Sequence, residues 1–554
     1  MRKAKTTEKI SFTAPQVQTK VIPAPTDGWD AISPLASMDP KRAPILNNWV
    51  PRPGWVELRG GFYPWQFRLP GSLPVETLMC YRALGTEILF AASGSVIYNV
   101  STQNTATSVQ TGLNSARWQY VNFTPALAAT VIQCVNGVDQ LRMYNGTSWS
   151  TPSITGLPSS LTTAAITNIH AQKRRLWYVL GNGSGGGSTV CAFMPTDAIT
   201  GAIAGTLDLG ALWDKGGYLV AISDWTIDGG NGPQDYMIFL SNRGQASIYS
   251  GTDPTSATAW SLVGTFDLAP PISSRCCTKL GSDVGLITQQ GVIPISQALP
   301  FDPTSERSVA ITARIQNAMA NAAINGLTLF GWQLITFPPQ QLVILNVPQV
   351  ENVTQVQYIM NALTGAWCQF TGWNANCFEI FNNQLYFGGN AGQVNQAFIG
   401  SSDYTNSIQA DMQCAYNYFD APGNVKRVTM VQPFITAAQT ISPSLSVDSD
   451  FVIQTQTAGF QILDAGSLWD QGTWDSAVWF GSTTQTTQWL STEAVGHALA
   501  VHMTLNVSTN NSQAAGIFDF TVFDTAEFDQ SVTTNPTVLQ VNAFNALYEL
   551  GGVI

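Results

Sequence analysis

Short apolar runs separated by turn sequences dominate the middle of the chain. Between about Thr86 and Gly400, stretches rich in Val, Ile, Leu, Tyr and Phe are broken by Asn-Gly, Ser-Gly, Gly-Gly and Gly-Asn pairs. Runs of this kind, bounded by such turns, are typical of β-hairpins. We therefore expect hairpins or meanders at residues 87–100, 131–150, 176–194, 236–249, 284–295 and 341–360.

The hairpins recur at a nearly constant spacing. Positions that are equivalent in successive units lie 46, 49, 56 and 46 residues apart, at Tyr98, Tyr144, Phe193, Tyr249 and Ile295. One four-stranded propeller blade takes roughly 40 to 50 residues. The spacing predicts a β-propeller over residues 71–400.

One segment inside this region has helical periodicity instead. Asp302 and Pro303 form an N-cap and first-turn pair, and apolar residues follow at helical spacing as far as Asn325-Gly326. A helix start signal followed by this spacing predicts a single helix inserted between strands. Its apolar positions are Ile311, Ile315, Met319 and Ala322.

The segment before the propeller is dense in proline and tryptophan. Between Val21 and Pro74 the prolines exclude long helices and central strands, while four tryptophans indicate packing against a scaffold. We expect residues 1–70 to form a basic arm and an extended segment that docks on the body or on a neighbouring subunit. We also expect Trp49 and Trp55 to be buried there.

The last third of the chain stays β-like without the blade repeat. Residues 428–434, 445–453, 499–507 and 518–523 alternate apolar and polar positions, which predicts a separate β-sandwich-like domain over residues 401–554. It carries a Trp-Asp repeat whose tryptophans we expect at packing or interface positions: Trp469, Trp474 and Trp479. The predicted fold class is thus all-β, a propeller core with an extended N-terminal segment and a C-terminal β-sandwich-like domain.

Composition narrows the class of protein. The 554 residues include 24 Lys and Arg against 35 Asp and Glu, a net charge of −11, with only 11% charged and 45% hydrophobic residues. Such values argue against a disordered chain and against a basic nucleic-acid binder. The first 20 residues carry a net +4, so the start is a basic arm that is either a solvated terminus or orders on a partner.

Signals for chemistry are sparse. The only histidines are His170, His497 and His502, no G-x-S-x-G sequence is present, and none of the eight cysteines forms a C-x-x-C pair. The stretch from Asp470 to Trp474 is close to the Asp-box of sialidase-like propellers, but it occurs once. We therefore predict no catalytic, cofactor or metal site, and a protein that is not an enzyme.

No secretory signal or membrane span is expected. Arg2, Lys3, Lys5 and Lys9 are followed by mixed polar sequence, and no apolar run approaches the roughly 18 residues of a span. A protein made in the cytoplasm with reduced thiols is the expectation.

Two motifs resemble a known family. The first is Gly28-Trp29-Asp30, followed by Asn48-Trp49-Val50-Pro51-Arg52-Pro53-Gly54 and by Glu57-Leu58-Arg59-Gly60-Gly61; the second is the Trp-Asp repeat at 469–479. Together they resemble the tail nozzle, or packaged-DNA stabilisation, proteins of short-tailed bacteriophages (podoviruses). The motifs cover about 60 residues, and their order extends the resemblance along most of the chain.

The resemblance implies a structural virion protein of the tail, assembled in the host cytoplasm. It implies a homo-hexameric ring below the portal and adaptor, near tail fibre or needle components, that retains the packaged genome and passes duplex DNA during ejection without reading its sequence. The alternative class is a propeller glycosidase or carbohydrate-binding adhesin at the host surface. An acid-lined pocket at the propeller mouth with an exposed Trp would indicate that alternative.

Overall fold

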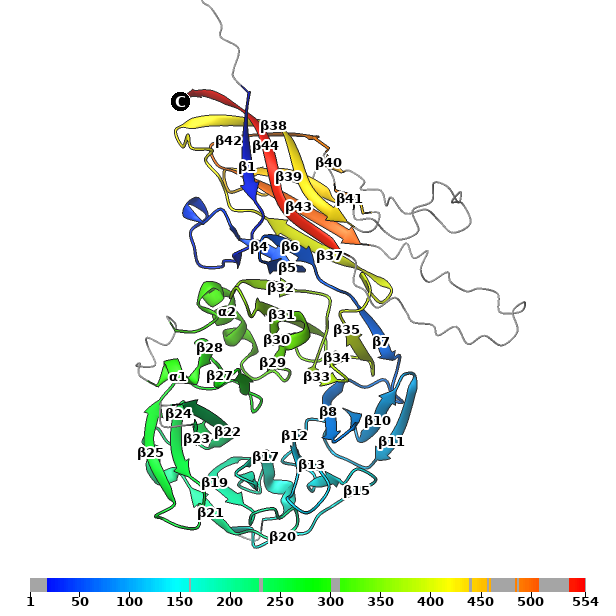
Figure 1. The fold of residues 1–554 in the computed structure, drawn as a ribbon, viewed down its shortest axis with the longest axis vertical. Helices are drawn as coiled ribbons and strands as arrows, with labels where there is room; N and C mark the ends of the chain where they lie inside the picture. Colours follow the sequence, from blue (N-terminus) through cyan, green and yellow to red (C-terminus); the bar gives the residue numbers. More distant parts are fainter. Residues whose placement is uncertain are drawn as a thin grey trace, which may run out of the picture.

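The computed structural model confirms an all-β fold with a propeller core (Figure 1). It describes residues 17–158, 161–228, 233–299, 309–437, 441–455, 458–459, 484–485, 488–507 and 538–553. Among these residues, the α-helices are α1 (Ile295–Ala298) and α2 (Gln316–Gly326). None of the described helices is both long and apolar enough to span a bilayer.

Seven groups of antiparallel strands form the blades of the propeller; blades one to five are separate sheets, and blades six and seven are the two ends of one 14-stranded sheet. Blade one holds β8 (Val75–Ala83), β9 (Thr86–Ser93), β10 (Val96–Thr102) and β11 (Thr105–Gln110). Blade two holds β12 (Gln119–Phe123), β13 (Val131–Val135), β14 (Arg142–Tyr144) and β15 (Trp149–Ser150). Blade three holds β17 (Ile166–Gln172), β18 (Arg175–Gly181), β19 (Gly187–Phe193) and β21 (Gly205–Asp208).

The remaining blades continue around the ring. Blade four holds β22 (Leu219–Asp228), β23 (Pro233–Ser241), β24 (Gln245–Gly251) and β25 (Trp260–Asp267), and blade five holds β26 (Cys277–Leu280), β27 (Asp283–Thr288) and β28 (Gly291–Pro294). Blade six holds β29 (Gln333–Phe337), β30 (Leu342–Val350), β31 (Thr354–Asn361) and β32 (Trp367–Phe370). Blade seven holds β33 (Cys377–Phe381), β34 (Gln384–Gly388), β35 (Val394–Ala397) and β7 (Phe62–Gln66).

The repeat seen in the sequence follows the blades. Four of the five equivalent positions lie on the third strand of blades one to four, and the fifth directly follows β28, the third strand of blade five. Hairpin contacts between neighbouring strands are local in sequence, which is why the spacing of turns marks each blade.

The ring is closed by a strand from the N-terminal segment. β7 pairs antiparallel with β35, with Phe62 opposite Ala397, and so provides the outer strand of blade seven. Strand pairing therefore crosses the boundary expected at residue 70. The extended segment is part of the propeller as well as of the domain beyond it.

The helical prediction was too long at its start. Residues 309–312 are not helical, a 3-10 turn covers Ala313–Ile315, and α2 begins at Gln316. The physical reason is the open edge of three-stranded blade five, where the Ile311 amide donates to the Val292 carbonyl at 3.0 Å. The expected start at Asp302 and Pro303 lies outside the described residues.

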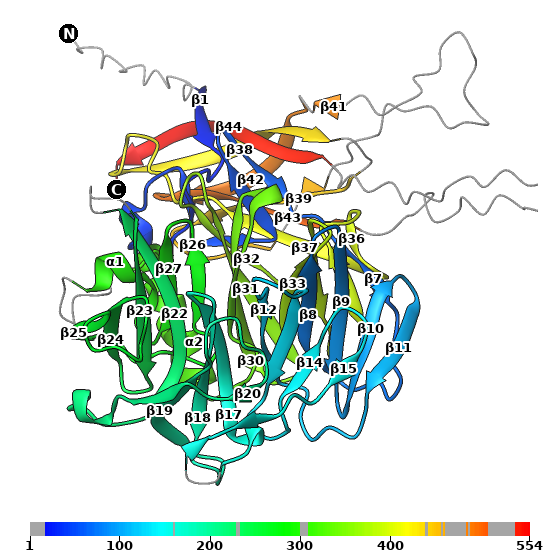
Figure 2. The same cartoon turned by 60° about the horizontal axis from the view of Figure 1, so that its bottom comes forward.

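Two sheets form the domain beside blades six and seven (Figures 1 and 2). The first contains β1 (Val17–Pro23), β5 (Trp49–Arg52), β6 (Trp55–Leu58), β38 (Asn424–Ala437), β41 (Thr484–Gln485), β42 (Leu490–Gly496) and β44 (Leu539–Val553). The second is the middle of the 14-stranded sheet whose ends form blades six and seven, joined to them by the pairs β32–β4 and β36–β7. It contains β4 (Ile45–Asn47), β36 (Ser402–Asp403), β37 (Asn406–Gln413), β39 (Ser444–Ser449), β40 (Ala458–Gly459) and β43 (Leu499–Val507).

The two sheets bury a common core. Val431 and Phe544 of the first sheet belong to the same buried cluster as Met412 and Leu505 of the second. Because β1 and β6 pair with β44, and β5 pairs with β6, the N-terminal segment contributes strands to this domain too. The strand expected at residues 518–523 lies outside the described residues.

Candidate functional site

Part of the first motif that carries the family resemblance, residues 48–61, forms the joint between the propeller and the C-terminal sheets. Asn48, held at a left-handed φ of 62°, is 1% exposed. Its side-chain amide donates to the Thr371 hydroxyl at 2.8 Å and to the Gln409 carbonyl at 2.6 Å, and its Oδ1 accepts from the Thr371 amide at 2.9 Å. One side chain thus bonds to the turn after β32 and to β37.

Arg59 is the centre of this joint. Its Nε donates to Asn48 Oδ1 at 2.8 Å, and its two terminal nitrogens donate to the two carboxylate oxygens of Asp403 at 2.8 and 2.6 Å. The remaining donors bond to the carbonyls of Gly60 and Thr371. The Arg59 side chain is 0% exposed, so this is a buried, bidentate ion pair with every guanidinium donor satisfied.

The two glycines of the motif are needed for close backbone approach. A Cβ on Gly61 would lie 1.9 Å from the Ser402 carbonyl oxygen, and a Cβ on Gly60 would lie 2.8 Å from the Phe398 Cα. Any side chain at Gly61 would push β36 away from the N-terminal segment. The Glu57 to Gly61 motif is therefore explained by packing at the joint.

The Gly28 to Asp30 motif packs nearby. Asp30 is 2% exposed and accepts bonds from the amides of Ile32 and Ser33 and from Arg42 at 2.9 Å. Burial opposes its ionisation, but these hydrogen bonds outweigh burial and lower the pKa of Asp30. The motif therefore fixes the loop between β2 (Gly28–Trp29) and β3 (Arg42–Ala43).

The tryptophans singled out in the sequence differ in their surroundings. Trp49 is 0% exposed and belongs to the core that the two C-terminal sheets share. Trp55, which we expected to be buried, is only partly buried on β6, where its indole donates to Glu57 Oε2 at 3.3 Å. Trp469, Trp474 and Trp479 lie outside the described residues.

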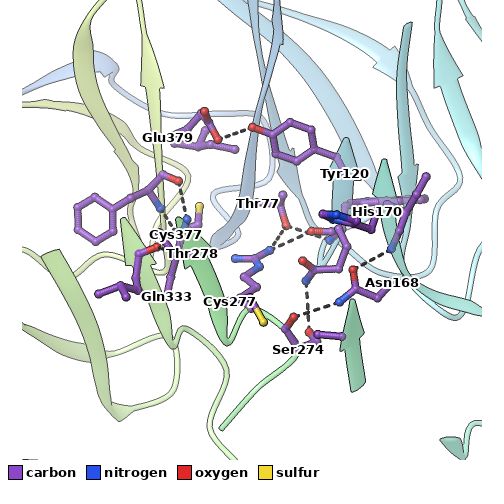
Figure 3. Close-up of a pocket in the computed structure, with 18 of the residues that line it drawn as sticks. Thr77, Tyr120, Asn168, His170, Ser274, Cys277, Thr278, Gln333, Cys377 and Glu379 are labelled. Atoms are coloured by element: carbon purple, nitrogen blue, oxygen red, sulfur yellow. Dashed lines mark hydrogen bonds between the residues drawn. The ribbon is translucent and has the colours of Figure 1, made fainter. Parts of the chain in front are cut away.

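A second candidate site is the cavity on the propeller axis. It has a volume of about 230 Å³ and is lined by the innermost strands of all seven blades, β8, β12, β17, β22, β26, β29 and β33 (Figure 3). Its polar side chains include Thr77, Tyr120, His170, Gln333 and Glu379. A polar cavity at this place is where a propeller enzyme would bind a ligand.

Most of these polar groups bond one blade to the next. The Gln333 amide exchanges two 2.9 Å hydrogen bonds with the backbone of Phe378, joining blades six and seven. The Thr278 hydroxyl donates to the Leu334 carbonyl at 2.6 Å, joining blades five and six. The Gln333 amide and the Thr278 hydroxyl therefore bond to the protein itself, which leaves them less able to bind a ligand.

Two carboxylates at the inner strands have opposite pKa shifts. Burial raises the pKa of Glu379, although Arg82 at 2.7 Å and the Tyr120 hydroxyl, which donates to the carboxylate, both favour its ionised form. Burial also opposes ionisation of Asp224, but hydrogen bonds from His170 and Lys279 outweigh burial and lower the pKa of Asp224. The sequence offered no signal for either position.

Arg275 reaches across the ring. It precedes β26 of blade five, yet its guanidinium donates to the Thr77 hydroxyl of blade one at 2.8 Å and to the Trp118 carbonyl at 3.1 Å. Its guanidinium also lies 4.9 Å from the Phe330 ring centroid. Burial lowers the pKa of Arg275. This side chain therefore braces opposite sides of the ring and occupies part of the axis.

The two other histidines contact different carboxylates. His497 lies 4.0 Å from Asp450, and His502 is buried between Asp411 at 2.7 Å and Asp448 at 3.0 Å. Burial raises the pKa of Cys80, Cys377 and Cys414 to about 12, which keeps these thiols protonated. Within the described ranges, no three His, Cys, Asp or Glu residues gather as a metal site would require.

Most cations of the body are neutralised by nearby carboxylates. In the described part of the chain, twelve lysine and arginine side chains lie within ion-pair distance of an Asp or Glu. They are Lys20, Arg42, Arg52, Arg59, Arg82, Arg117, Lys173, Arg174, Arg175, Lys215, Lys279 and Arg427. Twelve of the nineteen lysine and arginine side chains that the structure describes therefore have a carboxylate close by that competes with phosphate.

Comparisons with known proteins identify no family. No family profile matches the sequence, and no curated protein matches it. Among solved structures, one that the comparison matches is a glycoside hydrolase family 43 arabinoxylan arabinofuranohydrolase from Bacillus subtilis, in complex with cellotetraose. The match has a TM-score of 0.24 and 8% identity and covers 91% of this chain and 95% of that chain. Similarity at this level is no evidence for a shared activity.

Proposed function

We propose that this protein is a structural component of a short-tailed phage virion, the tail nozzle. In this role it forms a homo-hexameric ring below the portal and adaptor, retains the packaged genome and lets it pass during ejection. The observation that carries the proposal is the pairing of the body's cations in a chain of net charge −11. The resemblance of the N-terminal motifs supports it.

The electrostatic argument concerns sliding of DNA. Tight binding of a duplex needs clustered Lys and Arg whose contacts release counterions from phosphate, which makes affinity fall steeply with salt. A cation that is already paired, such as Arg174 with Asp197, has little attraction left for a phosphate. A surface built this way would guide DNA without gripping it.

In this proposal the DNA passage lies between subunits. The axial cavity of one propeller, about 230 Å³, is too small for a duplex, and Arg275 crosses it. The chain would therefore contribute an outer surface to the channel wall. The rigid joint at Arg59 would hold propeller and C-terminal sheets in a fixed relation within each subunit.

Three measurements test the proposal. Purified protein mixed with portal and adaptor should form a six-subunit ring in electron micrographs, and particles lacking the protein should package DNA and then leak it.

Full-length protein should bind duplex DNA weakly at physiological salt, and replacing Arg2, Lys3, Lys5 and Lys9 by glutamine should remove the remaining binding. Filled particles that stay stable without the protein, or tight salt-dependent binding by the glutamine variant, would contradict the proposal.

The second candidate function is that of a propeller glycosidase. The observation in its favour is that two carboxylates on inner strands, Glu379 of blade seven and Asp224 of blade four, have pKa values shifted in opposite directions, as the two carboxyl groups of such enzymes do. Against it, Glu379 is held by Arg82 of blade one and Tyr120 of blade two, and Asp224 by His170 of blade three and Lys279 of blade five, in contacts that join the blades to one another. We favour the structural role because burial in the ring raises the pKa of Glu379 against the effect of its partners, and hydrogen bonds within the ring lower the pKa of Asp224, so both shifts follow from the packing of the ring.

A further inference from the structure

A pocket of unusual composition lies outside the propeller axis, at the outer side of blade seven. It has a volume of about 250 Å³ and is lined by β7, the turn after β34 and the start of β37. We call it the amide pocket. Its key side chains are the amides of Asn390, Gln393, Asn395 and Asn406 and the rings of Phe67 and Tyr404.

Two amide oxygens in the pocket are unsatisfied. Asn395 is 5% exposed, and its Oδ1 has no hydrogen-bond partner among the residues that the structure describes. The same is true of Asn390 Oδ1, while Asn390 Nδ2 donates to the Val353 carbonyl at 2.9 Å. Buried polar groups are normally hydrogen-bonded, and an exception needs a reason such as a ligand.

The pocket carries no free charge. Asp403 is the single charged residue among its lining side chains, and Arg59 engages both of its carboxylate oxygens at 2.8 and 2.6 Å. A phosphate, a nucleotide or a sialylated sugar would find no cation here. The ligand that fits is uncharged and rich in groups that both donate and accept hydrogen bonds.

An exposed aromatic ring, Phe67, and a half-buried one, Tyr404, border the amides. Phe67 is 56% exposed, and its ring centroid lies 6.0 Å from that of Tyr404. Tyr404 adopts a φ of 56°, which is uncommon for a bulky residue, and its amide donates to the Phe62 carbonyl at 3.0 Å. Strained backbone of this kind clusters at ligand-binding positions. Aromatic faces beside planar amides can stack on the apolar face of a sugar ring while the amides bind its hydroxyl groups.

We propose that the amide pocket is a binding site for a neutral oligosaccharide. Its volume is close to the lower end of ligand pockets, roughly 300 Å³, which suits the terminal unit of a glycan. Each of these two oxygens exposes less than 1 Å², so a carbohydrate hydroxyl donates to Asn390 Oδ1 or Asn395 Oδ1 only after the side chain turns toward the pocket. The site is separate from the axial cavity and does not depend on the proposed role in the tail.

The test uses the full-length protein on an array of immobilised glycans. The array holds neutral oligosaccharides of glucose, galactose, mannose and N-acetylglucosamine, with sialylated and phosphorylated glycans beside them. We expect binding to at least one neutral member, with the affinity for that glycan then measured by calorimetry. Binding to no glycan, or only to charged ones, would overturn the proposal.

Variants locate the site. Phe67→Ala and Asn406→Ala, at exposed positions, should each weaken binding by about tenfold, whereas Tyr218→Ala, a 41% exposed aromatic on another part of the ring, should leave it unchanged. Asn395→Leu should abolish binding while keeping or raising the melting temperature, because it removes a buried unsatisfied amide. Affinity unchanged by Phe67→Ala and Asn395→Leu would refute the assignment.

Discussion

Replacing Arg59 by methionine should destabilise the protein more than any surface change of charge. The substitution keeps most of the side-chain volume but removes both hydrogen bonds to Asp403, whose side chain is only 6% exposed. The buried carboxylate then has no cation. Breaking a buried ion pair by removing one partner costs about 3–5 kcal/mol, because the remaining charge stays desolvated.

The structure indicates where this cost arises. Asn48 Oδ1 keeps a 2.9 Å hydrogen bond from the Thr371 amide when Arg59 is removed, so that acceptor remains satisfied. The carbonyls of Gly60 and Thr371 lose a donor but are neutral. The Asp403 carboxylate is therefore the main source of the loss.

Urea unfolding followed by tryptophan fluorescence measures the effect. Arg59→Met should lower the unfolding free energy by about 3–5 kcal/mol. Arg174→Met, which breaks an exposed pair in which the arginine is 58% exposed, should cost at most about 1 kcal/mol. The double variant Arg59→Met/Asp403→Leu should recover at least half of the loss, since an apolar pair replaces a lone charge. If Arg59→Met unfolds within about 1 kcal/mol of the wild-type free energy, the ion pair does not hold the joint. The same conclusion follows if the effects of Arg59→Met and Asp403→Leu simply add in the double variant.

Three further outcomes are expected. Gly61→Ala should prevent soluble expression or lower the melting temperature sharply, because its Cβ would lie 1.9 Å from a carbonyl oxygen, whereas Gly423→Ala, with open space around it, should be neutral; equal melting temperatures would contradict this. Hydrogen bonds to two carboxylates outweigh burial and raise the pKa of His502 to about 9 from 6.5, so its stabilisation is fully present below about pH 6.5 and is lost as pH rises to 9. The difference in unfolding free energy between wild type and His502→Asn should therefore shrink by roughly 3 kcal/mol over that range, and a constant difference would refute it. A panel of glycan and ester substrates should show no turnover, and turnover abolished by Glu379→Gln would favour the glycosidase.

The sequence alone was sufficient for the features that depend on local contacts. Strands of one blade pair with their neighbours through short turns, so the spacing of Tyr98, Tyr144, Phe193 and Tyr249 marks four successive blades. The alternating pattern after Ser401 likewise predicted sheets with one buried face, and the structure contains them. Local propensity failed at Ile311, where helical spacing was overridden by hydrogen bonding to the edge of blade five.

Only the tertiary structure determined how distant segments meet. Arg59 and Asp403 are 344 positions apart, and β1 pairs with β44 from the other end of the described chain. The outer strand of blade seven also comes from before blade one. A local pattern of apolar and polar residues cannot predict such pairings. Each segment contains only one of the two groups that form the ion pair or hydrogen bond, and the other group lies far away in the sequence. The amide pocket was equally invisible in the sequence, since its asparagines and aromatic rings come together only when the ring closes.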